Sequence, residues 1–250
     1  MCNIISIEGN IGAGKTTFIN LLEKECNNIG LNNIIFLKEP VDEWNNIKDD
    51  NITILEKFYE DQNKYAFSFQ ILTFITRLKH ILDIIEKKSD FTIIIDRCLL
   101  TDKYVFMQML YDDNKIDPYS FQIYNLLFNY FLNKLPKHKH IYLKSSVKLL
   151  RQKINKRNRK GENISDAYLI KSTNYHNNYY ENNKNSLLVI NMDNIKLYSD
   201  DLYDSLNENY KILITNVIYI ILKEKYDNNS YLIDIFGFLI CMIIIYFFIQ

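Results

Sequence analysis

The residues best suited to carry chemistry form a glycine-rich segment close to the N-terminus. Residues 9–17 read Gly-Asn-Ile-Gly-Ala-Gly-Lys-Thr-Thr and match G-x-x-x-x-G-K-[ST], a pattern that binds nucleoside triphosphates. Its glycines let backbone N–H groups turn inward around phosphate oxygens, and a following helix N-terminus adds favourable dipole charge. We expect Lys15 to contact the β- and γ-phosphates and the Thr16 hydroxyl to bind Mg²⁺. An ordinary glycine turn before a helix is the alternative.

Charged side chains also follow two other apolar runs that are typical of strands. Glu39 follows one of them, and Asp96 and Arg97 follow another. Phosphoryl transfer needs positioning, charge stabilisation and a base that orients the attacking hydroxyl. Glu39 is a candidate base, Asp96 can join Thr16 around Mg²⁺, and Arg97 can neutralise the transferred group. A capping or surface role is the alternative for each residue.

The elements that must position these side chains alternate along the chain. Strand-like apolar runs lie at residues 3–8, 33–37, 91–96, 140–143 and 187–190. Helical periodicity is seen at residues 17–24, 52–88 with a break near Asp61, 99–109, 118–135, 146–157, 168–180 and 197–222. This alternation predicts an α/β fold, with a five-stranded parallel sheet that helices cover on both faces. Ligands of such sheets bind beyond the carboxyl ends of the strands.

A second informative stretch lies inside the long helical segment. Gln70 and Arg77 are two helical turns apart and therefore share a face, and Phe69 is beside them. A glutamine offers a donor and an acceptor in one plane, which suits the edge of a nucleobase, and aromatic rings offer stacking surface. The alternative is an amphipathic core helix whose polar residues face water.

Composition limits the classes of partner. Lys and Arg together number 30 among the 250 residues, and so do Asp and Glu, which gives a formal net charge of zero. The protein therefore has no net positive charge that would attract nucleic acid. The four cysteines are scattered without a C-x-x-C pair, which indicates free thiols and a reducing compartment. The chain starts almost directly in a strand, so we expect no signal peptide. We expect a cytoplasmic protein with one large domain at residues 1–225.

The C-terminal segment at residues 231–250 has a different composition. It contains an uninterrupted apolar run at residues 235–249, whereas a membrane-spanning helix needs about 20 residues and at least about 17. Asp234 lies near the end of the segment, and Lys223 and Lys225 lie on the side that would stay cytoplasmic. The segment is a candidate membrane anchor. A terminal helix or strand packed on the domain is the alternative.

Several motifs in one order resemble the deoxyribonucleoside kinases, which include deoxycytidine, deoxyguanosine and insect-type multisubstrate kinases. The resemblance covers about residues 1–220. Its motifs are the glycine loop, Glu39-Pro40-Val41 with Trp44, Tyr59 with Phe69-Gln70, Asp96-Arg97, Lys156-Arg157-Asn158-Arg159 with Glu162, and Ile164-Ser165 with Tyr168-Leu169. It implies a P-loop kinase fold with a short basic lid at about residues 153–163. It also implies a homodimer that uses ATP and Mg²⁺ to phosphorylate the 5′-hydroxyl of a deoxynucleoside in nucleotide salvage.

The resemblance also implies roles for individual residues. Glu39 takes the 5′-hydroxyl proton, Arg97 holds the 5′-oxygen and the transferred phosphate, and Asp96 helps to place Mg²⁺. Gln70 pairs with the base, bordered by Trp44, Phe69 and Phe106, while Tyr59 and Glu162 bind the sugar 3′-hydroxyl. The implied ATP-binding residues are Gly9, Asn10, Ile11, Gly12, Ala13, Gly14, Lys15, Thr16, Thr17, Lys153, Arg157 and Arg159.

Arg77 and Asp102 fall where deoxycytidine and deoxyguanosine kinases carry an Arg–Asp pair beside the base. The resemblance therefore implies a preference for deoxycytidine and purine deoxynucleosides over thymidine. The alternative is that the two residues pair with each other only as structure.

The chain departs from the family pattern at three places. Cys98 stands where the family usually has Ser, and Asp96 stands where the animal enzymes have Glu. One residue is missing between Glu162 and Ile164, which leaves the role of Glu162 less secure than that of Glu39. Two other functions stay open, namely a nucleoside monophosphate kinase of the thymidylate type and a membrane-tethered nucleotide-binding regulator without catalysis.

Overall fold

Five parallel strands form the central sheet of this computed structural model, in the order β2-β5-β1-β6-β7. The structure describes residues 3–87, 91–136, 138–159, 161–181, 183–195 and 208–226, so the apolar tail at residues 231–250 lies outside it. The strands are β1 (Asn3–Glu8), β2 (Ile34–Leu37), β5 (Thr92–Asp96), β6 (His138–Lys144) and β7 (Ser186–Asn191). The predicted five-stranded parallel sheet is confirmed.

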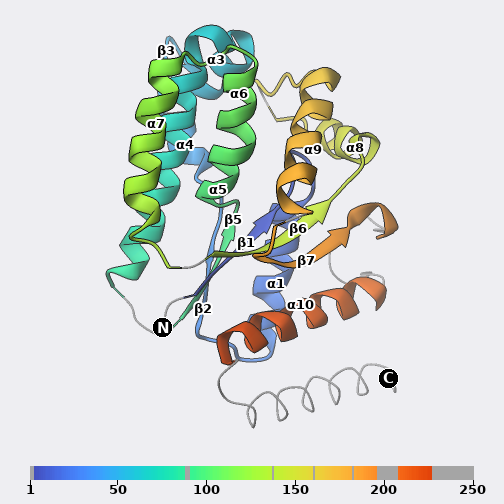
Figure 1. Cartoon of the computed structure of the whole chain (residues 1–250). Coiled ribbons are helices and arrows are strands. Elements are labelled where there is room, and N and C mark those ends of the chain that lie inside the picture. Colours follow the sequence, from blue (N-terminus) through green and yellow to red (C-terminus); the bar gives the residue numbers. More distant parts are fainter. Residues whose placement is uncertain are drawn as a thin grey trace.

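Helices cover both faces of the sheet (Figure 1). Side chains of successive strand residues point to opposite faces, so Ile94 packs in one core with α1 (Lys15–Asn28) and α10 (Glu208–Tyr226). Its neighbours Ile93 and Ile95 pack in a second core that α4 (Gln62–Ile85) covers. A strand that is buried on both faces must be apolar throughout, which explains the continuous apolar run in β5.

The predicted break near Asp61 is confirmed. Thr53 begins α3 (Ile54–Glu60) with a capping box, because its hydroxyl accepts from the Glu56 N–H while the Glu56 carboxylate accepts from the Thr53 N–H. Asp61 ends this helix, and its carboxylate accepts from the Lys64 N–H to cap α4.

The helix expected from Ile52 begins only at Ile54. Residues 52–53 instead form β4 (Ile52–Thr53), which pairs with β3 (Lys48–Asp49) in a two-residue hairpin. Asp50 and Asn51 have φ values of 47° and 61°, which is the conformation that such a hairpin turn requires. The helix α2 (Val41–Asn46) precedes this hairpin.

The remaining helices lie close to their predicted positions. The segment predicted at residues 99–109 is composite, with a π-helical stretch at Asp102–Met107 between α5 (Leu99–Thr101) and α6 (Gln108–Asp112). The others are α7 (Pro118–Leu132), α8 (Val147–Arg157), α9 (Asp166–Tyr180) and the 3₁₀ turn η2 (Met192–Asn194). Within the described ranges, no helix is long and apolar enough to cross a membrane.

Candidate active site

A cavity of about 740 Å³ opens at the carboxyl ends of β1, β2 and β5, which is a volume typical of sites for small ligands. Most of the residues predicted for ATP, Mg²⁺ and substrate line it, whereas Gly9, Asn10 and Ala13 do not. The lining residues that the sequence predicts are Ile11, Gly12, Gly14, Lys15, Thr16, Thr17, Glu39, Trp44, Tyr59, Phe69, Gln70, Arg77, Asp96, Arg97, Asp102, Phe106, Lys153, Arg157, Arg159 and Glu162.

The glycine loop has the tight shape of a phosphate cradle. Gly12 has a φ of 82°, and a Cβ atom there would lie 2.8 Å from Ile154 Cγ1, so only glycine fits. The ammonium of Lys15 reaches back over the loop and donates to the Gly9 and Asn10 carbonyls at 3.2 and 3.3 Å. The Asn10 side chain turns away from the cavity and donates to α9 residues, including Thr173 Oγ1 at 2.8 Å. It therefore anchors the loop against α9.

Burial changes the acidity of Lys15 in this loop. Desolvation, together with the nearby Arg97 guanidinium, lowers the pKa of Lys15 to about 8. A phosphate group at this position would favour the charged form, because it brings negative charge next to the ammonium.

Thr16 and Asp96 have the geometry of a divalent-cation site. The Thr16 hydroxyl donates to Asp96 Oδ2 at 2.8 Å, while Asp96 Oδ1 is buried without a hydrogen-bond partner among the described residues. Burial raises the pKa of the Asp96 carboxyl group. A bound cation would lower this pKa again, because its positive charge favours the carboxylate. Mg²⁺ prefers oxygen ligands and is often held by one carboxylate together with phosphates. The two residues therefore fit Mg²⁺.

Glu39 lies between two arginines at the centre of the cavity. Its Oε1 accepts from Arg97 Nη1 at 3.0 Å and from Arg77 Nη2 at 2.6 Å. Burial alone would raise the pKa of Glu39, but Arg97 and Arg77 lower it to about 2. The side chain is therefore a carboxylate at neutral pH, as a general base must be.

The predicted base-binding residues meet on one wall. Gln70 is only 3% exposed, and its Oε1 has no hydrogen-bond partner among the described residues. Phe69 lies beside it, 5.7 Å from Trp44 and stacked at 4.8 Å on Phe58, measured between ring centroids. Phe106 packs under the Arg97 guanidinium at 4.8 Å from its ring centroid. An unsatisfied amide oxygen on a cavity wall that also carries aromatic rings suits a planar polar ligand.

The residues predicted for the sugar and for the lid also line this cavity. Glu162 accepts from Arg157 at 2.6 Å, and Arg159 lies 3.9 Å from the same carboxylate. Tyr59 lines the cavity beside them, and burial raises the pKa of its hydroxyl well above the usual value. Lys153 donates to a backbone carbonyl of the glycine loop at 3.3 Å. The basic stretch therefore lies against the phosphate cradle.

Sequence reasoning missed several lining residues. Thr73 is one helical turn after Gln70 and faces the same cavity, so helical periodicity could have identified it. Phe58, Tyr168, Met192 and Tyr210 also contribute. They come from separate elements, and their apolar or aromatic character does not distinguish them from core residues.

The parallel α/β sheet, the glycine loop and the charged strand ends define a phosphate-binding α/β protein of the P-loop class. The family model described as deoxynucleoside kinase matches residues 5–216. The chain belongs to the deoxynucleoside kinase family. This confirms the resemblance carried by the motifs.

The chain is also similar in sequence to individual deoxynucleoside kinases. The probable deoxycytidine kinase of fowlpox virus is 35% identical over 121 residues, which are 48% of this chain and 46% of that protein. Deoxycytidine kinase 2 of Gallus gallus is 26% identical over 187 residues, covering 68% and 71% of the two chains. Deoxyguanosine kinase of Bacillus subtilis is 27% identical over 167 residues, covering 66% and 72%. The match to the fowlpox protein thus spans about half of that relative.

Proposed function

We propose that this protein transfers the γ-phosphate of ATP to the 5′-hydroxyl of a deoxyribonucleoside, a step of nucleotide salvage. The observation that carries the proposal is Gln70, which lines the same cavity as Lys15 and Glu39 and whose amide oxygen has no hydrogen-bond partner among the described residues. One cavity therefore offers a nucleobase-binding group, a base and a phosphate cradle. Membership of the deoxynucleoside kinase family supports this assignment.

The geometry gives each charged residue a part in the transfer. The 5′-O–H bond breaks, its proton passes to Glu39, and the oxygen forms a bond to the γ-phosphorus as the bond to ADP breaks. Arg97 contacts Glu39 and so lies beside the reacting oxygen, where its charge stabilises the transferred group. Lys15 binds the phosphates of the donor. Mg²⁺, held by Thr16 and Asp96, would neutralise developing charge on those phosphates.

Base preference follows from the residues beside Gln70. Arg77 donates to both oxygens of Asp102, at 2.6 and 2.7 Å, and both residues line the cavity. We propose that this pair favours deoxycytidine and purine deoxynucleosides over thymidine. A site built to hydrogen-bond one base edge rejects a base that lacks the matching groups.

The alternative functions have weaker support. A nucleoside monophosphate acceptor would bring a 5′-phosphate against the Glu39 carboxylate, and two negative charges there would repel each other. A regulator without catalysis would not need Lys15, Glu39 and Arg97 together in one cavity. A kinase that acts on the nucleoside itself fits the charges better.

Comparison of two acceptors tests the proposal. The protein would be incubated with Mg²⁺-ATP and either deoxycytidine or its 5′-monophosphate, and products would be separated by ion-exchange chromatography. We expect conversion of deoxycytidine to its 5′-monophosphate, with purine deoxynucleosides as further acceptors. Faster conversion of the monophosphate to the diphosphate would contradict the proposal.

A dimer is proposed through the outer face of α7. Five large apolar side chains at helical spacing are exposed on it, namely Tyr119, Ile123, Leu126, Leu127 and Tyr130. A two-fold dimer buries the same patch on both subunits, so this one apolar face could form the whole interface. Sedimentation equilibrium should give a dimer for the wild type and a monomer for Leu126→Glu. A wild-type monomer at micromolar concentration would contradict this proposal.

The role of residues 231–250 as a membrane anchor stays a prediction. Fractionation of cells that express the full chain or a chain ending at residue 230 tests it. The full chain should enter the membrane fraction and the shortened chain should not. An equal distribution of both chains would contradict it.

A further inference from the structure

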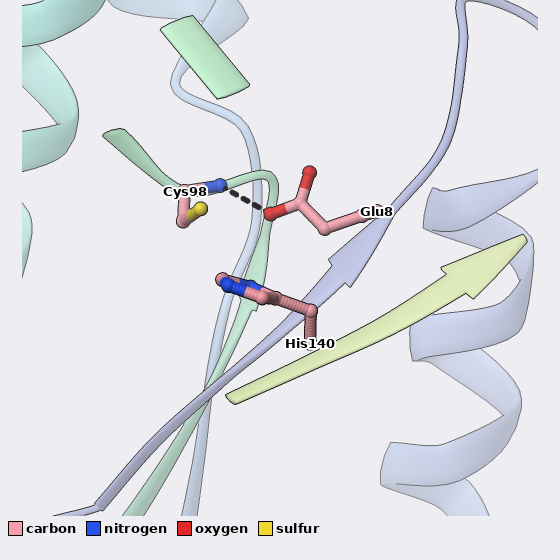
Figure 2. Close-up of side chains that lie close together, drawn as sticks. All are labelled: Glu8, Cys98 and His140. Carbon is pink, nitrogen blue, oxygen red and sulfur yellow. Dashed lines mark hydrogen bonds between the residues drawn. The ribbon is translucent and has the colours of Figure 1, made fainter. Parts of the chain in front are cut away.

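A buried carboxylate directly before the glycine loop has no part in the transfer as derived above. Glu8 is the last residue of β1, and its side chain is fully buried. Its Oε1 accepts from the Cys98 N–H at 2.8 Å, and its Oε2 accepts from the Thr101 hydroxyl at 2.5 Å. Figure 2 shows Glu8 reaching from its strand to the turn that carries Cys98. Hydrogen bonds to a charged acceptor are stronger than those between neutral groups.

The backbone that Glu8 binds is strained. Arg97, which lies between β5 and Cys98, has a φ of 67°, in the left-handed region that side chains other than glycine rarely adopt. Such a conformation is unfavourable for a residue with a side chain and persists only where the surroundings enforce it. The Arg97 N–H donates to the Ile7 carbonyl at 3.2 Å, and the next N–H along the chain donates to Glu8. The end of β1 therefore holds both amides of this turn.

The strained turn determines where the Arg97 side chain goes. Its guanidinium donates to the Gly9 carbonyl at 3.1 Å and to Glu39 at 3.0 Å. Gly9 follows Glu8 directly, so one short segment supports both the phosphate cradle and the arginine that faces it. A displacement of the turn would move the guanidinium away from both partners.

The second oxygen of Glu8 supports the next part of the site. Thr101 ends α5, and its hydroxyl also contacts the Tyr180 hydroxyl of α9. Asp102, the partner of Arg77, follows Thr101 directly. Through its two oxygens, Glu8 thus binds the backbone next to Arg97 and the residue next to Asp102.

His140 completes a cluster whose composition could suggest a metal site. Ligand-type atoms of Glu8, Cys98 and His140 lie within 4.8 Å of one another (Figure 2). However, both Glu8 oxygens already accept hydrogen bonds, and Ser6 contacts His140 Nδ1 at 2.9 Å. Burial raises the pKa of the Cys98 thiol, which keeps it protonated, whereas zinc binds the thiolate. The hydrogen bonds of Glu8 account for the cluster better than a cation does.

We propose that Glu8 is a positioning residue for phosphoryl transfer, which holds the turn that directs Arg97 at Glu39 and at the Gly9 carbonyl. This inference rests on the proposed kinase function. It assigns a task to a residue that does not line the cavity, and it explains why a carboxylate is tolerated in the interior of the sheet.

Two substitutions test the role kinetically. Glu8→Gln keeps the size and one acceptor oxygen but replaces the other with a donor, and Thr101→Val removes the hydroxyl that Glu8 binds. We expect kcat to fall by about 100-fold for Glu8→Gln, because displacements of about 1 Å have this effect. KM for ATP should change by less than about threefold, since Lys15 and the glycine loop stay in place. The double variant should lose little more than Glu8→Gln alone, because both changes break one contact.

Ser6→Ala is the matched control, because Ser6 is another buried polar residue of β1 whose hydroxyl approaches the Cys98 thiol and His140 but binds neither the Cys98 N–H nor Thr101. It should lower the melting temperature but leave kcat unchanged. If Glu8→Gln fails to fold, Thr101→Val alone must show the same selective loss of kcat. Equal losses of kcat in Ser6→Ala and Glu8→Gln, or additive losses in the double variant, would overturn the positioning role.

A crystal structure of Glu8→Gln gives a readout that does not depend on the identity of the substrate. We expect the Arg97 backbone to leave the left-handed region and its guanidinium to lose the contact with the Gly9 carbonyl. Retention of both features would overturn the inference. A wild-type protein without any nucleoside kinase activity would instead contradict the proposed function, while the crystallographic comparison would still decide the role of Glu8.

Discussion

Arg77 donates a hydrogen bond of 2.6 Å to Glu39 from the guanidinium that also binds Asp102. The candidate base for the 5′-hydroxyl and the pair beside the nucleobase are therefore joined by one side chain. The contact between Arg77 and Asp102 is buried, since the two residues are 6% and 2% exposed, whereas the contact with Glu39 is partly buried. This arrangement connects the choice of nucleobase to the position of the reacting carboxylate.

Removal of the Arg77–Asp102 pair should relax base selection. The double variant Arg77→Met/Asp102→Ala removes both charges together, because removal of one partner would leave a lone buried charge. We expect the kcat/KM of thymidine relative to that of deoxycytidine to rise by at least about 10-fold, as the pocket loses its polar groups. An unchanged ratio in a four-nucleoside assay would show that the pair is only structural.

Glu39→Gln should lower kcat strongly and spare donor binding. An amide cannot accept the 5′-hydroxyl proton, and general bases contribute about 10²–10⁴-fold to rates. We expect a fall in kcat within this range, while ATP affinity measured by calorimetry stays within about twofold. Turnover at the wild-type rate would remove Glu39 from the mechanism.

The buried ammonium of Lys15 predicts a loss of ATP capture in mildly alkaline solution. Burial and Arg97 lower its pKa to about 8, so the free enzyme loses this positive charge as the pH rises through 8. The value of kcat/KM for ATP reports the free enzyme and should therefore decline above this pH. Lys15→Arg keeps its charge and, although less active, should show no such decline. A flat wild-type profile up to pH 9.5 would contradict the assignment.

Gln70→Leu should weaken nucleoside binding selectively. The substitution removes the amide that faces the cavity, and two lost hydrogen bonds amount to about 2 kcal/mol, or roughly 30-fold in kcat/KM for the nucleoside. Lys79→Ala is a suitable control on the same helix, because the Lys79 side chain is 60% exposed and pairs only loosely with Glu43, at 3.5 Å. Similar losses in both variants would indicate an indirect effect on α4.

Much of the fold could be predicted because local patterns and tertiary structure agree. The apolar runs of β1 and β5 are buried on both faces, and Asp61 both ends α3 and caps α4. The β3–β4 hairpin could not be foreseen, since its turn uses Asp50 and Asn51 in a left-handed conformation and Ile52 also fits a helical pattern.

Part of the candidate site could be predicted from the order of the strands. The carboxyl ends of neighbouring parallel strands meet, so the glycine loop, Glu39 and Arg97 come together by topology alone. The link between Arg77 and Glu39 could not be read from spacing, because the two residues are 38 positions apart and meet only through packing. The positioning role proposed for Glu8 could not be predicted either, because Glu8 resembles an ordinary strand residue in the sequence.

The most direct test of the central claim is a steady-state assay with Mg²⁺-ATP and each of the four natural deoxynucleosides, with products identified by ³¹P nuclear magnetic resonance. We predict 5′-monophosphates, with deoxycytidine or a purine deoxynucleoside giving a higher kcat/KM than thymidine. The absence of a 5′-monophosphate from all four nucleosides, by a protein that binds Mg²⁺-ATP, would contradict the account.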